Sequence, residues 1–103
     1  MKWYKKLYLG ESIKGEKWLR FQIAFGKKSK GYYCIALSDS PRNLLDIYPS
    51  RFLRTPEMNT DRIYLVGLAS DKSEAFEVVR DIIEDVYVHT HAFNIRIYLG
   101  ITV

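Results

Sequence analysis

The feature that most constrains the fold is a change of hydrophobic period in the C-terminal part of the chain. Arg62–Ala69 is mostly apolar, Asp71–Val88 repeats apolar residues at helical spacing, and Phe93–Leu99 alternates apolar with polar residues. A repeat near 3.6 residues is typical of an amphipathic helix, and a repeat of two is typical of a strand. The sequence therefore predicts a β-α-β unit within a domain that mixes helix and sheet.

The predicted helix begins with its own start signal. Asp71 is placed to cap the first turn, while Glu74 reaches back toward the cap in a variant of the capping box. The predicted inner stripe consists of Ala75, Val79, Ile82 and Val86, broadened by Phe76, Val78 and Ile83.

The last predicted strand has one face toward the core and one face at least partly in water. The residues expected to face the core are Phe93, Ile95, Ile97 and Leu99. The residues expected on the opposite face are Asn94, Arg96 and Tyr98.

In the N-terminal half, an ambiguous segment separates two predicted strands. Tyr4–Leu9 and Tyr32–Leu37 are predicted as strands, because aromatic and apolar residues fill both. Between them, Ile13–Phe25 fits the helical and the strand period alike. Ser12 as a cap favours a helix, whereas Gly15 weakens one by about 1 kcal/mol relative to alanine. Periodicity leaves both structures open, and we favour the helix.

A short helix is predicted before the middle of the chain, with Ser40 as its cap and Pro41 in its first turn. Its apolar side consists of Leu44, Leu45, Ile47 and Tyr48, and Pro49 interrupts it. A second short turn is expected at residues 50–53 and a loop at residues 55–61.

These elements together predict an α+β fold. With residues 13–25 helical, the order is β-α-β, a short helical connection, then β-α-β. That order indicates a ferredoxin-like two-layer sandwich, with two helices on one face of a four-stranded antiparallel sheet. With residues 13–25 as a strand, the alternative is an antiparallel meander with one long helix.

Length and composition predict one α+β domain over residues 1–103. A content of 48% hydrophobic against 27% charged residues is typical of a folded globular protein. The apolar runs are far shorter than the roughly 20 residues of a membrane-spanning helix, and no apolar signal core follows the N-terminus. We therefore expect a cytoplasmic protein with no membrane partner. The single cysteine, Cys34, agrees with a reducing compartment.

The positive charge gathers in the first third of the chain. Residues 1–31 hold nine basic and two acidic residues, a net charge of +7, whereas the whole chain carries +4. Lysines neutralise phosphates and interleaved aromatic residues stack on bases, so this third is a candidate nucleic-acid surface. The candidate lysines are Lys5, Lys6, Lys14, Lys17, Lys27, Lys28 and Lys30.

Four stretches of sequence stand out along the chain: Tyr4–Ser12, Asn43–Ile47, Tyr64–Ala69 and the helix from Glu74 to Tyr87. Together they resemble a family of short bacterial proteins of unknown function. The resemblance covers most of the chain and implies no activity, cofactor or site residue. This chain departs from the family at Lys14–Phe25, where the relatives have a lysine-rich helix.

Few residues have the pattern of a chemical site. His89 and His91, with Asp85 four residues before His89, are candidate ligands of a transition metal. A helix C-terminus also favours histidine through its dipole, so we expect a structural role and predict neither metal nor cofactor.

Cys34 lies inside an apolar strand, where thiols are commonly buried and inert. The chain has no nucleophile elbow, P-loop or dinucleotide fingerprint, so no catalytic residue is predicted.

The predicted function is a non-enzymatic interaction or binding module, with a nucleic-acid-binding regulator as the alternative. An open sheet face offers a surface for a second copy, and Tyr and Arg are enriched at interfaces. The residues expected on that face are Tyr64, Arg96 and Tyr98. We therefore expect a homodimer, and an enzyme is the minority interpretation.

Overall fold

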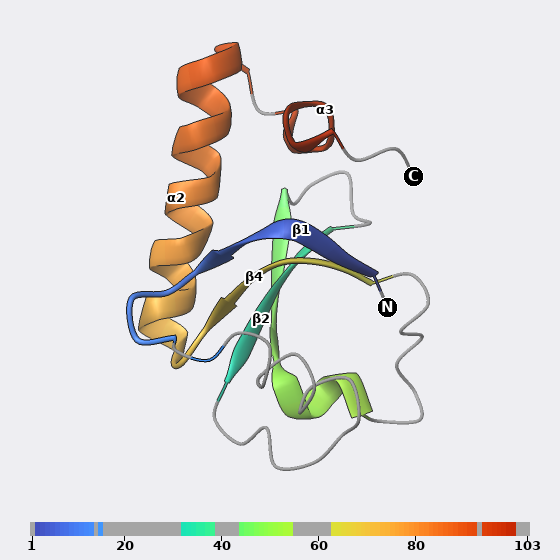
Figure 1. The fold of residues 1–103 in the computed structure, drawn as a ribbon, viewed down its shortest axis with the longest axis vertical. Coiled ribbons are helices and arrows are strands. Elements are labelled where there is room, and N and C mark those ends of the chain that lie inside the picture. Colours follow the sequence, from blue (N-terminus) through green and yellow to red (C-terminus); the bar gives the residue numbers. More distant parts are fainter. Residues whose placement is uncertain are drawn as a thin grey trace.

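The computed structural model describes residues 2–13, 15, 32–38, 44–54, 63–92 and 94–100. In chain order its elements are β1 (Lys2–Leu9), β2 (Tyr33–Leu37), β3 (Leu45–Pro49), the 3-10 helix η1 (Ser50–Arg54), β4 (Tyr64–Ala69), α2 (Lys72–Thr90) and α3 (Ile95–Leu99). Figure 1 shows α2 along one side of the sheet, and α3 beside the C-terminal part of α2. Neither α2 nor α3 contains an apolar stretch long enough to cross a membrane.

The strands form one mixed sheet in the order β1-β4-β2-β3. β1 runs parallel to β4, with Trp3 beside Leu65, whereas β2 runs antiparallel to both of its neighbours. A four-stranded sheet with one long helix confirms the predicted α+β class. The ferredoxin-like arrangement is not confirmed. The strand order also differs from that of a meander, because the first strand pairs with the last.

The central strand β4 is buried on both faces. Side chains that face α2, including Val66 and Ala69, join a cluster with Ile35 and the inner residues of α2. Leu65 and Leu68 point the other way and join a second cluster with Cys34. A strand with neighbours on both edges and packing on both faces is mostly apolar, which is why residues 62–69 were predictable as a strand.

The helix α2 confirms the prediction at residues 71–88. The Asp71 side chain accepts a hydrogen bond from the Glu74 backbone N–H at 2.8 Å, as an N-cap does. The buried positions are Ala75, Val78, Ile82 and Val86, together with the Glu74 side chain. Phe76, predicted to broaden the inner stripe, is instead 57% exposed, because it lies about a third of a turn around the helix from the middle of the buried positions.

Gly67 of β4 lets the helix approach the sheet closely. A Cβ at this position would lie 2.9 Å from the Val78 side chain and 3.0 Å from the Tyr8 carbonyl oxygen. Contacts this short are closer than packed atoms tolerate, so only glycine fits without a shift of α2 or β1.

The helix predicted at residues 40–48 is wrong where the structure describes it, because residues 45–49 form the edge strand β3. Leu45 and Ile47 alternate with Asp46 and Tyr48, and that period of two is also present in the sequence. In so short a segment the two periods compete, and pairing with β2, Ile35 beside Ile47, decides for the strand. Pro49 suits the end of an edge strand.

The strand predicted at residues 93–99 is also wrong, because Ile95–Leu99 forms the short helix α3. Ile95 is 4% exposed and Leu99 is buried, four residues apart on one helical face, whereas Ile97 is 74% exposed. Asn94 caps the helix and Gly100 ends it in the left-handed conformation with a φ of 71°. The β-α-β unit is therefore a β-α-α unit.

Two other predictions meet the structure only in part. The short turn expected at residues 50–53 corresponds to η1. The helix expected at residues 13–25 and the loop at residues 55–61 lie outside the described residues, apart from residues 13 and 15, so both stay predictions.

The buried carboxylate of Glu74 ties the turn after β1 to the start of α2. It accepts hydrogen bonds from the Ser12 hydroxyl, from the Ser12 N–H at 3.1 Å and from the Ser70 N–H at 2.9 Å. Burial alone would raise the pKa of this carboxyl, but the bonds from Ser12 and Ser70 outweigh it and lower the pKa. Glu74 therefore stabilises the start of α2 as an anion. Its carboxylate accepts from the Ser70 N–H, one residue before the Asp71 cap toward which the sequence predicted it to reach.

Candidate functional site

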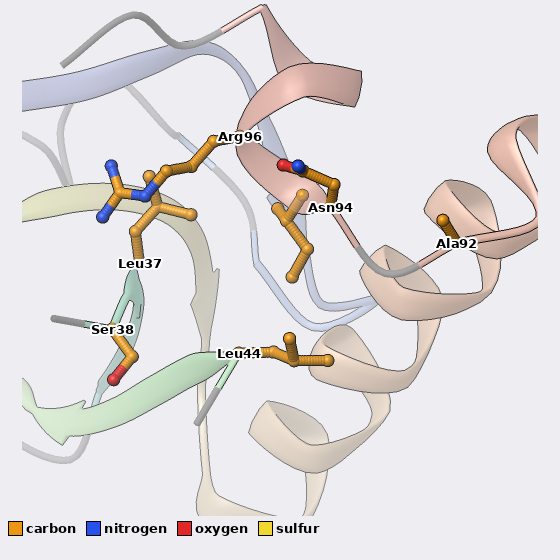
Figure 2. Close-up of a pocket in the computed structure, with 7 residues that line it drawn as sticks. Leu37, Ser38, Leu44, Ala92, Asn94 and Arg96 are labelled. Carbon is orange, nitrogen blue, oxygen red and sulfur yellow. The ribbon is translucent and has the colours of Figure 1, made fainter. Parts of the chain in front are cut away.

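A cleft opens where β2 ends and α3 begins, and Figure 2 shows the side chains around it. Its volume is about 410 Å³, within the range of roughly 300–1,000 Å³ that is typical of ligand pockets. The lining comes from the end of β2, the residue before β3, the α2–α3 connection and the first turn of α3. These residues are Leu37, Ser38, Leu44, Ala92, Asn94, Ile95 and Arg96.

The connection between α2 and α3 is shaped by the caps of the two helices. His91 ends α2 in the left-handed conformation, with a φ of 55°. The Asn94 side chain then accepts a hydrogen bond from the Ile97 N–H at 3.2 Å, which starts α3. Ile95 enters the core at the first position of α3, and the next residue, Arg96, lines the cleft.

The described residues of the cleft combine apolar walls with one cation. Leu37, Leu44 and Ile95 supply the apolar surface, and Figure 2 shows the Arg96 side chain extending from α3 toward the β2 side. Among the residues that the structure describes, no carboxylate pairs with the Arg96 guanidinium. Arginine binds carboxylates through two parallel hydrogen bonds. The lining therefore suits a carboxylate that sits beside an apolar group.

A separate polar cluster joins β1, α2 and α3. The Tyr8 hydroxyl donates a hydrogen bond to the Asp85 carboxylate at 2.9 Å, and the Tyr98 ring stacks on the His89 ring with centroids 5.2 Å apart. Burial, followed by the bond to Asp85, raises the pKa of the Tyr8 hydroxyl above its ordinary value of 10.0. A phenol held protonated and bonded in this way anchors β1 to α2.

The three candidate metal ligands have other partners. Asp85 accepts from Tyr8, the His89 Nδ1 lies 2.7 Å from the Asp85 carbonyl oxygen, and the His91 ring contacts the Tyr87 ring edge-on. Within the described part of the chain, no three His, Cys, Asp or Glu side chains are grouped to hold a metal.

The three interface candidates do not share a sheet face. Arg96 and Tyr98 lie on α3, because residues 95–99 are helical, whereas Tyr64 lies on β4. Tyr64 and Tyr98 both pack against the cluster beneath α2, and Arg96 lines the cleft. The open strand face on which their grouping was predicted is therefore not formed by residues 95–99.

Two of the seven lysines of the candidate nucleic-acid surface lie in the described part of the chain. Lys5 and Lys6 are exposed on β1, in the stretch between Trp3 and Tyr8 where the pairing of β1 with β4 shifts register. β1 lies at the edge of the sheet, where lysines also protect against pairing with other chains. The other five candidates, Lys14, Lys17, Lys27, Lys28 and Lys30, lie outside the described residues. Nucleic-acid binding therefore stays a prediction.

The sequence did not indicate the cleft. Arg96 was assigned to a strand face, and the described lining residues come from four separate stretches of chain. No protein-family model, curated protein or solved structure matches the chain. The resemblance to a family of short bacterial proteins therefore stays a prediction.

The sequence signal that could have placed Arg96 on a helix was the pair Asn94 and Gly100, which are typical of the start and end of a helix.

Cys34 is not among the residues that line the cleft, and its side chain is fully buried in the second cluster. Burial raises the pKa of its thiol to about 12, so the thiolate that a nucleophile needs is disfavoured at neutral pH. The cysteine is a packing residue in this fold.

We expect this buried thiol to make the protein less stable in alkali. The unfolded thiol ionises near its ordinary pKa of 9.0, while the folded thiol keeps its proton up to about pH 12. The free energy of unfolding is therefore fully retained below pH 9 and falls as pH rises from 9 toward 12, by about 1 kcal/mol at pH 10. Urea unfolding at pH 8 and pH 10 measures this loss. The Cys34→Ala variant should lose correspondingly less, and an equal loss in both proteins would contradict the assignment.

Proposed function

We propose that this protein is a non-enzymatic binding module whose cleft holds a short segment of a partner protein. The segment carries an acidic side chain next to an apolar one. The observation that carries the proposal is the Arg96 guanidinium, without a described carboxylate partner, beside the apolar walls of Leu37, Leu44 and Ile95. The acidic group would pair with Arg96, and the apolar neighbour would fill the space between the three aliphatic side chains.

The composition of the lining supports binding over catalysis. General acid–base and nucleophilic catalysis require a titratable or nucleophilic side chain at the reacting atoms. Cys34, His89 and His91 are not lining residues, and among the lining residues that the structure describes Arg96 is the one ionisable side chain. Arginine stays charged at any physiological pH, which suits recognition of an anion.

Peptide binding tests the proposal. We expect peptides with adjacent Leu and Asp or Leu and Glu to bind in fluorescence anisotropy, and their Leu-Asn and Leu-Gln counterparts to bind about tenfold more weakly or worse. Arg96→Gln should remove this preference, because it removes the cation and leaves the apolar walls. Arg51→Gln is the matched control, since Arg51 is exposed on η1 and stacks over the Phe52 ring instead of lining the cleft.

Two results would reject the proposed function. One is equal affinity for the acidic peptides and their amide counterparts, including no measurable binding of either. The other is an Arg96→Gln variant that still prefers the acidic peptides as strongly as the unchanged protein and the Arg51→Gln control.

A further inference from the structure

A stripe of apolar side chains runs along one flank of α2 outside the buried face. It consists of Phe76, Val79, Ile83 and Tyr87, called here the α2 stripe. Steps of three and four residues place these side chains above one another, as in the seam of a coiled coil. Phe76 is 57% and Tyr87 is 48% exposed, while Val79 and Ile83 are half-buried.

The α2 stripe lies on the flank of the helix that points away from β1. Asp85, which bonds to Tyr8 of β1, lies on the opposite flank, and the buried positions such as Val78 and Ile82 lie between the two. One flank of α2 is therefore tied to the sheet edge by a hydrogen bond, whereas the other carries two large aromatic side chains, Phe76 and Tyr87, that are about half exposed. Scattered apolar residues are normal on a surface, but a row of them at seam spacing marks a contact surface.

Two opposite charges accompany the α2 stripe. Arg80 and Glu84 are exposed beside it, and neither has an ion-pair partner within the described chain. They lie at equal distances on either side of Ile82 along the helix. A two-fold axis at the level of Ile82 would therefore set Arg80 opposite Glu84 of the partner subunit, and Glu84 opposite Arg80 of the partner subunit.

We infer that the α2 stripe is the interface of a homodimer, in which α2 packs antiparallel against α2 of a second copy. The same two-fold axis brings Phe76 within one residue of the level of the partner subunit's Tyr87, so the aromatic ends of both stripes meet. Because the two-fold axis sets each Arg80 opposite a Glu84, the surface is complementary in charge to a second copy of itself, which favours a second copy as the occupant. The homodimer expected from the sequence thus gains a surface on α2, independent of the cleft.

Charge reversal tests this interface in the full chain. Sedimentation equilibrium from about 1 µM to about 500 µM should show a dimer that dissociates on dilution. Arg80→Glu and Glu84→Arg each create two like-charge contacts across the axis and should each raise the dissociation constant about tenfold or more. The double variant Arg80→Glu/Glu84→Arg restores opposite charges and should return close to the original value. Phe76→Ala should weaken the dimer by a similar factor, because it removes the aromatic end contact.

Asp81→Arg is the matched control, because Asp81 is exposed on the side of α2 turned away from the stripe. It should leave the dissociation constant unchanged, and circular dichroism checks that each variant keeps its helix. A monomer at all concentrations would overturn the inference, as would single reversals without effect or a double variant that stays as weak as the singles. None of these results depends on peptide binding at the cleft.

Discussion

Replacing Ile82 with alanine should destabilise the protein by about 2–5 kcal/mol, the usual loss for a large aliphatic side chain removed from a core. Ile82 is fully buried at the middle of α2, in the same cluster as Ile35 and Val66 of the sheet. The cavity would lie between the helix and the two central strands, where backbone on both sides limits collapse. Domains of this size are stable by only about 5–15 kcal/mol, so the loss is a large share of the total.

Urea unfolding followed by circular dichroism measures this loss as a lower midpoint at an unchanged slope. The matched control is Ile97→Ala, which removes the same atoms from a side chain that is 74% exposed on α3. That control should change stability by no more than about 0.5 kcal/mol. If Ile97→Ala cost as much as Ile82→Ala, residues 95–99 would have to face the core as a strand, and the helix α3 would be wrong.

The second large effect is expected from Gly10→Ala, at about 1–3 kcal/mol. A Cβ at Gly10 would overlap the Glu74 carboxylate. That carboxylate cannot simply swing aside, because Ser12 and Ser70 both donate hydrogen bonds to it. The added methyl therefore either breaks these bonds or moves the turn after β1, and each outcome costs stability.

A double-mutant cycle isolates this clash. Glu74→Ala should itself cost about 1–3 kcal/mol, because it leaves the Ser12 and Ser70 N–H groups without their acceptor. In that background Gly10→Ala meets no carboxylate, so its further cost should nearly vanish and the two losses should fail to add. Full additivity in denaturant unfolding would mean that Gly10 is required for its backbone alone and not for the approach of Glu74.

The part of the fold that was predictable is the part where local pattern and tertiary packing agree. Residues 71–88 repeat apolar side chains over several helical turns and carry an aspartate cap, so α2 had no competing interpretation. The central strand at residues 64–69 is apolar on both faces because it is covered on both faces.

The wrong predictions fall on segments of about five residues, in which both periods are present at once. Leu45–Pro49 became a strand because β2 offers a partner for it. Ile95–Leu99 forms a helix. Its apolar and polar residues alternate as in a strand, but Asn94 and Gly100 cap the two ends of a helix, and these caps outweigh the alternation. The cleft depended on both of these outcomes, since Leu44 directly precedes the first segment and Arg96 lies in the second. A single mistaken strand at residues 93–99 was therefore enough to hide its cation.

The parallel pairing of β1 with β4 has a consequence for the order of events during synthesis. β1 leaves the ribosome first, yet within the described sheet its one neighbour is β4, beginning at Tyr64. The pairing of β1 within the described sheet therefore forms only after more than half of the chain has been made, a delay typical of folds built on distant contacts. During this time the exposed charges of Lys2, Lys5 and Lys6 oppose pairing of β1 with a strand of another nascent chain.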